Sequence, residues 1–168
     1  MTLAEINQLP ENEAIDLFRQ CCGVESWAAA LVATRPFSSA EALEKRAEEI
    51  WFDLGEQEWL KTFDYHAKIG DVESLKKKLG SRDWSSNEQS GIEGAGQQVI
   101  AELAEGNIAY EKKFGFIFLI FATGKSAADM LAILKQRINN ERPQEIENVA
   151  TEQNKITLLR IRQLFTEG

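Results

Sequence analysis

The sequence has a single histidine, His66, and only two cysteines, Cys21 and Cys22, in 168 residues. A zinc site normally needs several histidine or cysteine ligands, so we expect no metal site. The cysteines are adjacent, which matches neither a CxxC redox pair nor a zinc knuckle, and we expect two buried thiols in a reducing compartment. His66 is therefore the side chain best suited to take and return a proton at neutral pH.

Long apolar runs and an excess of basic charge are also missing. The longest apolar run, residues 116–122, is far shorter than the roughly 20 residues of a membrane-spanning helix. No basic segment followed by an apolar run opens the chain, and Thr166-Glu167-Gly168 is not a peroxisomal signal, so we expect a soluble, cytoplasmic protein. With 19 basic against 27 acidic residues the formal net charge is −8, which disfavours nucleic acid and anionic membranes as partners.

Gly124-Lys125-Ser126 matches the last residues of a nucleotide-binding P-loop. That motif also requires a glycine five residues before Gly124, where this chain has Leu119, so the sequence excludes a P-loop here. Ser126 with Asp129 instead predicts the start of a helix that runs through Ile138.

Apolar residues recur with the helical period of about 3.6 along almost the whole chain, and alternating strand patterns are nearly absent. Hydrophobic residues make up 43% and charged residues 27%, and no linker or internal repeat divides the chain. The sequence therefore predicts an all-α fold, a single-domain bundle over residues 1–168 with about seven to nine helices. The expected helices cover residues 11–22, 26–34, 38–54, a stretch around 59–63, 71–79, 87–110, 126–138 and 143–165.

Two of these helices have defined inward residues. Ser38 with Glu41 predicts a capping box that opens the third helix, which ends at Gly55. Its apolar stripe comprises Leu43, Ala47, Ile50 and Leu54. The inward residues of the long helix over 87–110 are Ile92, Val99, Ile100, Leu103 and Ile108.

Residues 113–121 are dense in aromatic and β-branched side chains, which favour a strand by propensity. No partner strand is predicted elsewhere in the chain. We therefore expect a buried, partly helical segment with a break at Gly115.

Trp59, Phe63 and His66 follow one another at helical spacing, so the imidazole continues a buried stripe and should lie at the edge of the core. Two interpretations remain open at this point. His66 is either a core-edge histidine with one hydrogen bond or an acid/base in a site.

The stretch from Ser85 to Gln89 also has two interpretations. Ser85 with Glu88, or Ser86 with Gln89, forms a capping box at the start of the long helix. The same helix start gathers backbone N–H groups and the side chains of Glu88 and Gln89, which together could bind a polar heterocycle.

Two arginines of the last helix differ in orientation. Arg160 shares a face with Ile146, Ala150, Gln153 and Thr157, whereas Arg162 lies about 200° round the helix from it. An inward arginine needs an anionic partner. That partner is either a structural carboxylate or the carboxylate of a substrate.

Short stretches at a characteristic spacing extend over the whole chain: Ser26-Trp27, Arg35-Pro36-Phe37, His66 with Ile69-Gly70, Ser85-Ser86-Asn87-Glu88-Gln89, Tyr110, Lys113-Phe114-Gly115-Phe116-Ile117-Phe118, Leu134, Arg137, Asn139, Glu145 and Leu159-Arg160-Ile161. Taken together, they resemble the 2-oxo-4-hydroxy-4-carboxy-5-ureidoimidazoline (OHCU) decarboxylases. These enzymes complete the conversion of urate to (S)-allantoin.

The resemblance implies an all-helical, often homodimeric enzyme that decarboxylates a small ureidoimidazoline substrate without a metal or organic cofactor. It implies that His66 is the acid/base and that Glu88, also a catalytic residue, binds the polar edge of the substrate with Gln89. Ser85 would be a supporting hydroxyl and Arg160 the anion anchor. Backbone groups of the segment that contains Phe114, Phe116, Ile117 and Phe118 would line the ring pocket.

The chain departs from the family at the residue after the histidine, which is usually proline and is Ala67 here. Proline restricts the backbone of the residue before it, whereas alanine allows a helix to continue through His66. This departure motivates a competing hypothesis, in which the chain is a non-catalytic helical binding module that has kept the decarboxylase scaffold.

Overall fold

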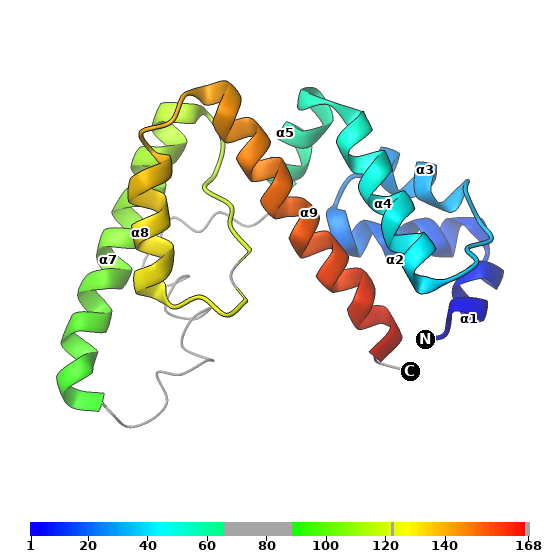
Figure 1. Cartoon of the computed structure of the whole chain (residues 1–168), viewed down its shortest axis with the longest axis horizontal. Coiled ribbons are helices and arrows are strands. Elements are labelled where there is room, and N and C mark those ends of the chain that lie inside the picture. Colours follow the sequence, from blue (N-terminus) through cyan, green and yellow to red (C-terminus); the bar gives the residue numbers. More distant parts are fainter. Residues whose placement is uncertain (66–88, 122, 167–168) are drawn as a thin grey trace. The chain divides into compact units, whose positions relative to one another are not determined.

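A computed structural model describes residues 1–65, 89–121 and 123–166 of the chain (Figure 1). These residues form eight helices and no strand, which confirms the predicted all-α class. The helices are α1 Leu3–Gln8, α2 Glu11–Cys22, α3 Glu25–Val32, α4 Ala40–Leu54, α5 Glu56–Tyr65, α7 Gln89–Phe114, α8 Ala127–Arg137 and α9 Arg142–Thr166. The helix predicted over residues 71–79 lies outside the described residues. Among the helices of these ranges, none has the length and apolar character to span a membrane.

The chain divides into two compact units. Unit 1 comprises Met1–His66 and Ala150–Gly168, and unit 2 comprises Ala67–Val149. Helix α9 is continuous across this division, with its first part in unit 2 and the remainder in unit 1. That residues 1–168 form one domain stays a prediction.

Sequence signals account for most helix ends of unit 1. As predicted, α2 ends at Gly23, which has a φ of 90°, and α4 ends at Gly55, with a φ of 91°. The predicted start of α4 is wrong by one residue. Ser39, not Ser38, is the N-cap, because its extended backbone lets its hydroxyl accept a hydrogen bond from the N–H of Ala42 at 3.0 Å.

The buried face of α4 contains Leu43, Ala47 and Trp51. The predicted members Ile50 and Leu54 are only half-buried. The face is shifted because Trp51 takes the inward position, where its large ring fills the core and its N–H finds an acceptor.

Indole N–H groups join the helices of unit 1. Trp27 of α3 donates to the carbonyl of Ala47 at 3.1 Å, and Trp51 of α4 donates to the carbonyl of Ala150 in α9 at 2.9 Å. Both rings are almost completely buried. Each indole therefore adds buried apolar area and satisfies its one polar atom in the core.

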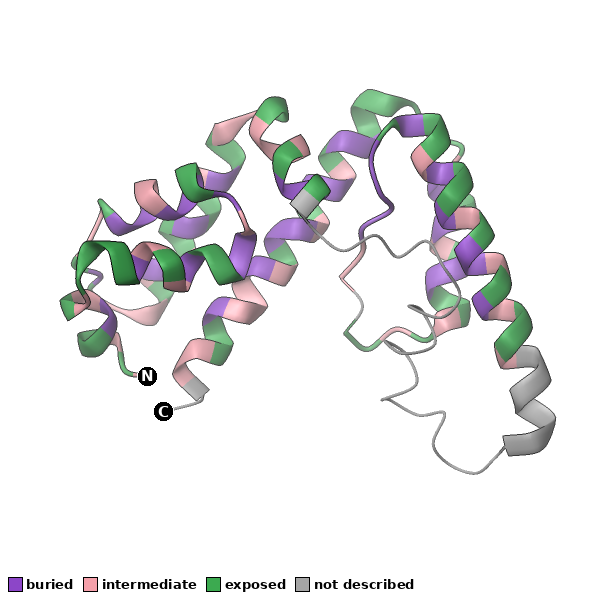
Figure 2. Cartoon of the chain, turned by 180° about the vertical axis from the view of Figure 1, so that it is seen from behind, coloured by how far each residue is buried: buried purple, intermediate pink, exposed green. Residues whose placement is uncertain are grey.

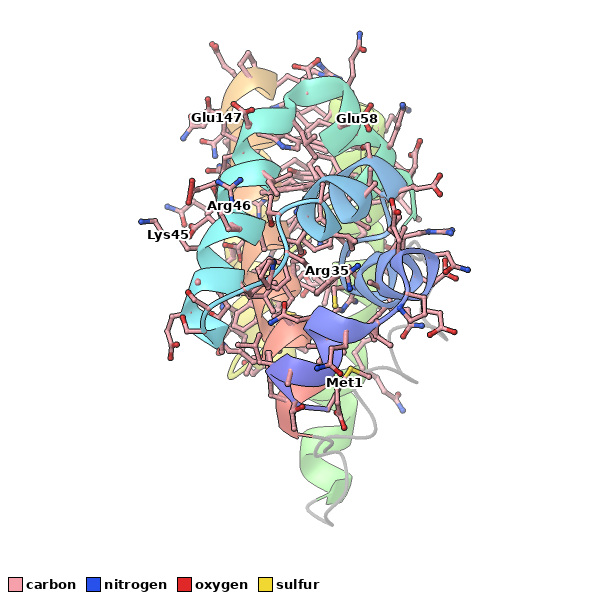
Figure 3. The ribbon with its side chains drawn as sticks, turned by 90° about the vertical axis from the view of Figure 1, so that its right-hand side faces the viewer. Met1, Arg35, Lys45, Arg46, Glu58 and Glu147 are labelled. Atoms are coloured by element: carbon pink, nitrogen blue, oxygen red, sulfur yellow. The ribbon has the colours of Figure 1, made fainter. Side chains whose placement is uncertain are left out.

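The turn after α3 is attached to α1 by an arginine. Helix α3 stops at Val32, two residues before the predicted end at Thr34, and the N–H of Arg35 donates to the carbonyl of Val32. The guanidinium of Arg35 lies beside α1 (Figure 3) and donates to the carbonyls of Ile6 at 3.0 Å and Leu9 at 2.8 Å. A cation at this position donates to carbonyls at the end of a helix, which carry partial negative charge.

Helices α7 and α8 lie side by side in unit 2 (Figure 1). Ile100 and Leu103 of α7 are buried as predicted, and Val99 is half-buried. The predicted inward position of Ile108 is wrong, since this side chain is 59% exposed. The buried face continues instead through positions 104, 107 and 110, which keep the helical period. The side chain of Ile92 lies outside the described part of α7.

Helix α7 extends to Phe114, four residues beyond the predicted end, and stops at Gly115, which has a φ of 87°. Residues 116–119 then form a continuous buried stretch without helix or strand (Figure 2). The predicted buried segment with a break at Gly115 is therefore confirmed.

The last two helices begin as predicted. Ser126 and Asp129 form a reciprocal capping box at the start of α8. Pro143 lies in the first turn of α9, where its missing N–H leaves no helical hydrogen bond unmade.

Gly106 allows α7 to approach α8 closely. A Cβ atom at this position would lie 2.8 Å from Cδ2 of Leu134, a side chain that is 2% exposed and has little room to move. Gly106→Ala should gain about 1 kcal/mol of helix propensity but lose about 1–3 kcal/mol to overpacking, so we expect a net loss of about 1 kcal/mol in the free energy of unfolding.

Urea unfolding followed by circular dichroism measures this effect. In a Leu134→Val background, which lacks the Cδ atoms, the same glycine substitution should become neutral or stabilising. Stabilisation by Gly106→Ala in both backgrounds would contradict the close packing.

Candidate functional site

The residues predicted for the site differ in what the structure shows of them. His66, Ser85 and Glu88 lie outside the described residues, and Gln89 begins α7 in a stretch whose side chains are not described. Arg160 belongs to unit 1. Unit 2 contains the remaining predicted residues, which are all buried: Phe114 at the end of α7, and Phe116, Ile117 and Phe118 in the stretch that follows Gly115.

Arg160 lies on the predicted inward side of α9, where Gln153 and Thr157 are buried and Arg160 itself is half-buried. Its Nη1 atom donates to the carbonyl of Cys21 at 3.2 Å, and this carbonyl lies in the last turn of α2. Carbonyls at the end of a helix lack partners within the helix and carry partial negative charge. The guanidinium therefore has one of its donors fixed by the backbone of another helix.

Arg162 has a more exposed environment than Arg160, as its position on the helix predicts. It is exposed, and its Nη2 atom lies 2.7 Å from Oε1 of Glu44. Within residues 1–65, 89–121 and 123–166, no carboxylate lies within ion-pair distance of Arg160. The charge of Arg160 is thus not neutralised by a carboxylate in this part of the chain.

Cys21 and Cys22 are both buried free thiols, as predicted. Burial raises the pKa of Cys21 to about 11, although the positive charge of Arg160 opposes this shift. Burial raises the pKa of Cys22 to about 12, against hydrogen bonds with Thr62 and Thr157. Both thiols are protonated at neutral pH and are therefore poor nucleophiles and poor metal ligands.

Phe114, Phe116 and Phe118 surround the ring of Tyr110. Their centroids lie 4.6, 6.0 and 5.3 Å from that of Tyr110, and Phe114 stacks on Phe116 at 5.9 Å. The aromatic side chains of the segment are thus used for packing inside unit 2.

The backbone of Ile117 and Phe118 is buried, and it has no hydrogen-bond partner among the residues that the structure describes. These residues are 6% and 3% exposed, and their N–H and C=O groups have no hydrogen bond in the described part of the chain. A buried polar group left in this way costs about 1–3 kcal/mol and is rare in native proteins. Unpaired donors and acceptors at one buried point are what a pocket for a polar ligand requires.

A buried ion pair lies behind this segment. Glu145 at the start of α9 is 0% exposed and Arg137 at the end of α8 is 9% exposed. Nε of Arg137 donates to Oε1 of Glu145 at 2.8 Å, and the hydroxyl of Tyr110 donates to the same oxygen. The other nitrogens of Arg137 donate to the carbonyl of Leu119 at 3.1 Å and to the Tyr110 hydroxyl at 3.3 Å.

The second oxygen of Glu145 accepts hydrogen bonds from Asn140 and Asn148, each at 2.7 Å. Asn139, one of the residues that carry the resemblance to the decarboxylases, does not reach Glu145 and donates to the carbonyl of Lys135 instead. Burial raises the pKa of Glu145, but the hydrogen bonds and the charge of Arg137 together outweigh it and hold this pKa below its usual value. Glu145 is therefore ionised in the folded chain at neutral pH.

Tyr110, Arg137 and Glu145 are among the residues that carry the resemblance to the family, but the sequence predicts no role for them. Helical periodicity contains a signal for Arg137, because it follows the buried Leu134 by three positions and so shares the inward face of α8. A charged residue on an apolar face requires a buried counter-ion. The identity of that counter-ion depends on how α8 and α9 pack.

The described residues contain no group of three or more histidine, cysteine, aspartate or glutamate side chains that could hold a metal ion. These residues form an all-helical protein, with Arg160 hydrogen bonded to a backbone carbonyl in unit 1 and a buried stretch without helix or strand, residues 116–119, in unit 2. The family model of OHCU decarboxylase matches residues 7–162, and the chain belongs to this family.

Proteins of known function show the same likeness. The chain is 38% identical over 154 residues to a uric acid degradation bifunctional protein of Arabidopsis thaliana, covering 90% of this chain and 47% of that protein. It is 28% identical to a bifunctional relative from Bacillus sp. (strain TB-90), of which it covers 33%. The chain thus spans half or less of the length of these relatives. It is 27% identical to the OHCU decarboxylase of Xenopus laevis, with 98% of this chain and 95% of that protein covered.

Two solved structures match with a TM-score of 0.71 each. One is the crystal structure of an OHCU decarboxylase in the presence of (S)-allantoin, which is 34% identical and covers 90% of this chain and 98% of that chain. The other is an (S)-allantoin synthase, which is 16% identical over 97% of this chain and 54% of that chain and shows the fold alone.

Glu145→Gln removes the buried charge and keeps the shape of the side chain. At about pH 7, Arg137 would then carry an uncompensated buried charge, and we expect the free energy of unfolding to fall by about 3–5 kcal/mol. The pKa of Glu145 is lowered on folding, so its charge stabilises the fold above the ordinary value of 4.5 and this contribution is lost as the pH falls through the lowered pKa. The stability difference between wild type and variant should therefore shrink towards about pH 3.

Urea midpoints measured across this pH range test the expectation. Glu147, which is exposed on the same helix and labelled in Figure 3, supplies the matched control Glu147→Gln, for which we expect little change. A difference for Glu145→Gln that stays constant at all pH values would contradict the assigned ion pair.

Proposed function

We propose that this chain catalyses the decarboxylation of OHCU to (S)-allantoin in urate degradation. The observation that carries the proposal is the family match over residues 7–162. The likeness to an OHCU decarboxylase crystallised in the presence of (S)-allantoin, at 34% identity over nearly the full length of both chains, supports it.

Arg160 is proposed as the anchor for the substrate carboxylate. Its un-neutralised charge supports this role, and so does its hydrogen bond to the Cys21 carbonyl, which fixes one nitrogen and leaves the others to bind an anion. A carbonyl partner orients the guanidinium and leaves its positive charge in place, whereas a carboxylate partner would neutralise that charge.

The backbone of Ile117 and Phe118 is proposed to bind the ring of the substrate. Its buried and unpaired N–H and C=O groups support this role, because they match the alternating carbonyl and N–H groups of a ureido-substituted imidazoline. The aromatic rings of the segment pack on Tyr110 and hold this backbone rigid.

His66 is proposed as the acid/base, with Ser85, Glu88 and Gln89 on the polar edge of the substrate. The bond from the ring carbon to the carboxylate breaks, and carbon dioxide leaves. The electron pair forms a C=C bond in the ring while the electrons of the C=N bond move to nitrogen, which takes a proton. His66 accepts the proton of the ring hydroxyl, which becomes a carbonyl, and a proton delivered to one face of the neighbouring carbon sets the (S) configuration.

The ring C=N bond of the substrate is itself the electron sink in this scheme, so we propose that no metal or organic cofactor takes part. We also propose that the protein acts in the cytoplasm as a homodimer with this small-molecule substrate. These proposals are supported by the family resemblance. A non-catalytic binding module, which Ala67 motivates, is the second candidate, and it would bind (S)-allantoin without turning over OHCU.

Freshly prepared OHCU separates the two candidates. Purified protein should accelerate its disappearance and give optically active allantoin, followed by circular dichroism, and His66→Gln should lose about 10²- to 10⁴-fold in rate because it lacks the acid/base. The thermal stability of His66→Gln should stay close to that of wild type. A racemic product, or binding of allantoin without turnover by the wild type, would refute the decarboxylase proposal.

Arg160→Gln and Arg162→Gln form a matched pair on one helix. The first removes the anchor for the substrate carboxylate and should lower kcat/KM by about 10- to 100-fold, since a charge-assisted hydrogen bond contributes about 1.5–3 kcal/mol. The second removes only an exposed ion pair with Glu44 and should leave kcat/KM almost unchanged. Equal effects of both substitutions would argue against the role of Arg160.

A further inference from the structure

Residues 116–121 follow Gly115 and are called the 116–121 segment below. One carbonyl of this segment, that of Leu119, accepts a hydrogen bond from the buried Arg137. Arg137 uses Nε for Glu145, Nη2 for Tyr110 and Nη1 for the carbonyl of Leu119, at 2.8, 3.3 and 3.1 Å. Leu119 directly follows Phe118, one of the residues with unpaired backbone groups. The guanidinium therefore bonds to the segment next to the groups that would bind a ligand.

Arg137 also contacts two aromatic side chains, Phe118 in the segment and Tyr110 in α7. The centre of the guanidinium lies 4.8 Å from the ring centroid of Phe118 and 5.8 Å from that of Tyr110, within the range of cation–π attraction. Carbonyl and ring together fix Phe118 and Leu119 at consecutive positions, which limits rotation of the peptide that joins them.

Stability alone does not account for this arrangement. Replacing a buried ion pair by well-packed neutral residues is often neutral or stabilising, because taking two charges out of water is costly. Here Glu145 accepts hydrogen bonds from four residues, Arg137, Tyr110, Asn140 and Asn148. The same arginine reaches a segment that is buried without helix or strand, residues 116–119. An irregular backbone has no hydrogen-bond ladder of its own to keep its shape.

We propose that Arg137 is a positioning residue for the substrate. Glu145 and Tyr110 set the orientation of its guanidinium, and the guanidinium sets the direction of the Ile117 and Phe118 backbone groups through the Leu119 carbonyl and the Phe118 ring. This inference rests on the proposed function, because it assigns those backbone groups to OHCU. Arg137 itself does not touch the substrate.

The test is the double variant Arg137→Met/Glu145→Gln. Methionine fills the space of the arginine stem without bonding to Leu119, and glutamine keeps an amide group for Tyr110, Asn140 and Asn148 without leaving an unpaired charge. Trp27→Phe is the control for lost stability, since it removes a buried hydrogen bond to Ala47 in unit 1. Arg137→Lys is the second variant, which keeps the charge but cannot reach Glu145, Tyr110 and Leu119 together.

Two measurements apply to these variants. Hydrogen–deuterium exchange of amides 117–121 in the absence of substrate should accelerate by about tenfold or more in the double variant and less in Arg137→Lys, with no change in Trp27→Phe. The KM for OHCU should rise by about tenfold, the equivalent of one hydrogen bond, with kcat altered much less, because the backbone contacts bind substrate and transition state alike.

Unchanged exchange or unchanged KM in a folded double variant would overturn the proposal, and so would a KM change of the same size in Trp27→Phe. The exchange measurement needs no turnover. If wild-type protein failed to convert OHCU, the proposed function would fall, while faster exchange in the double variant alone would still support the positioning of the segment by Arg137.

Discussion

Glu145 is a carboxylate with no exposed surface, and a charge in that position persists only when donors surround it. Arg137, Tyr110, Asn140 and Asn148 supply those donors from α8, α7, the turn before α9 and α9 itself. One side chain thus connects α7, α8 and the first part of α9, the helices that the structure describes in unit 2. Because hydrogen bonds are directional, the arrangement also specifies how the helices are rotated, which apolar packing alone specifies less strictly.

The residues bonded to Glu145 also hold the 116–121 segment. Gly115 ends α7, and the chain then crosses the interior of unit 2 without a hydrogen-bond ladder. The aromatic rings packed on Tyr110 and the bond from Arg137 to Leu119 keep this backbone in place. Within the described residues the backbone groups of Ile117 and Phe118 have no hydrogen bond, and neighbouring contacts stabilise the segment that contains them.

In unit 1, neutral groups make the hydrogen bonds that join the helices. Its helices are joined by indole N–H donors on backbone carbonyls, and Arg160 is held by the Cys21 carbonyl at the end of α2. Holding an arginine in this way keeps its positive charge effective, whereas the exposed Arg162 is paired with Glu44. Arg160 and Arg162 thus differ in how far their charge is neutralised, although they are two residues apart on α9.

The sequence by itself determined the helical class, most helix ends and the separation of Arg160 from Arg162, because these depend on periodicity and on local rules for glycine, proline and capping residues. It also predicted the break at Gly115 and the burial of the segment that follows. Two local features were missed: helix α1, and Ser39 instead of Ser38 as the cap of α4. The other failures depended on packing: Trp51 instead of Ile50 on the buried face of α4, and the exposed Ile108. Only the tertiary structure decided that Glu145 is the counter-ion of Arg137 and that both support the Leu119 carbonyl, since these contacts join residues on different helices whose approach no local pattern encodes.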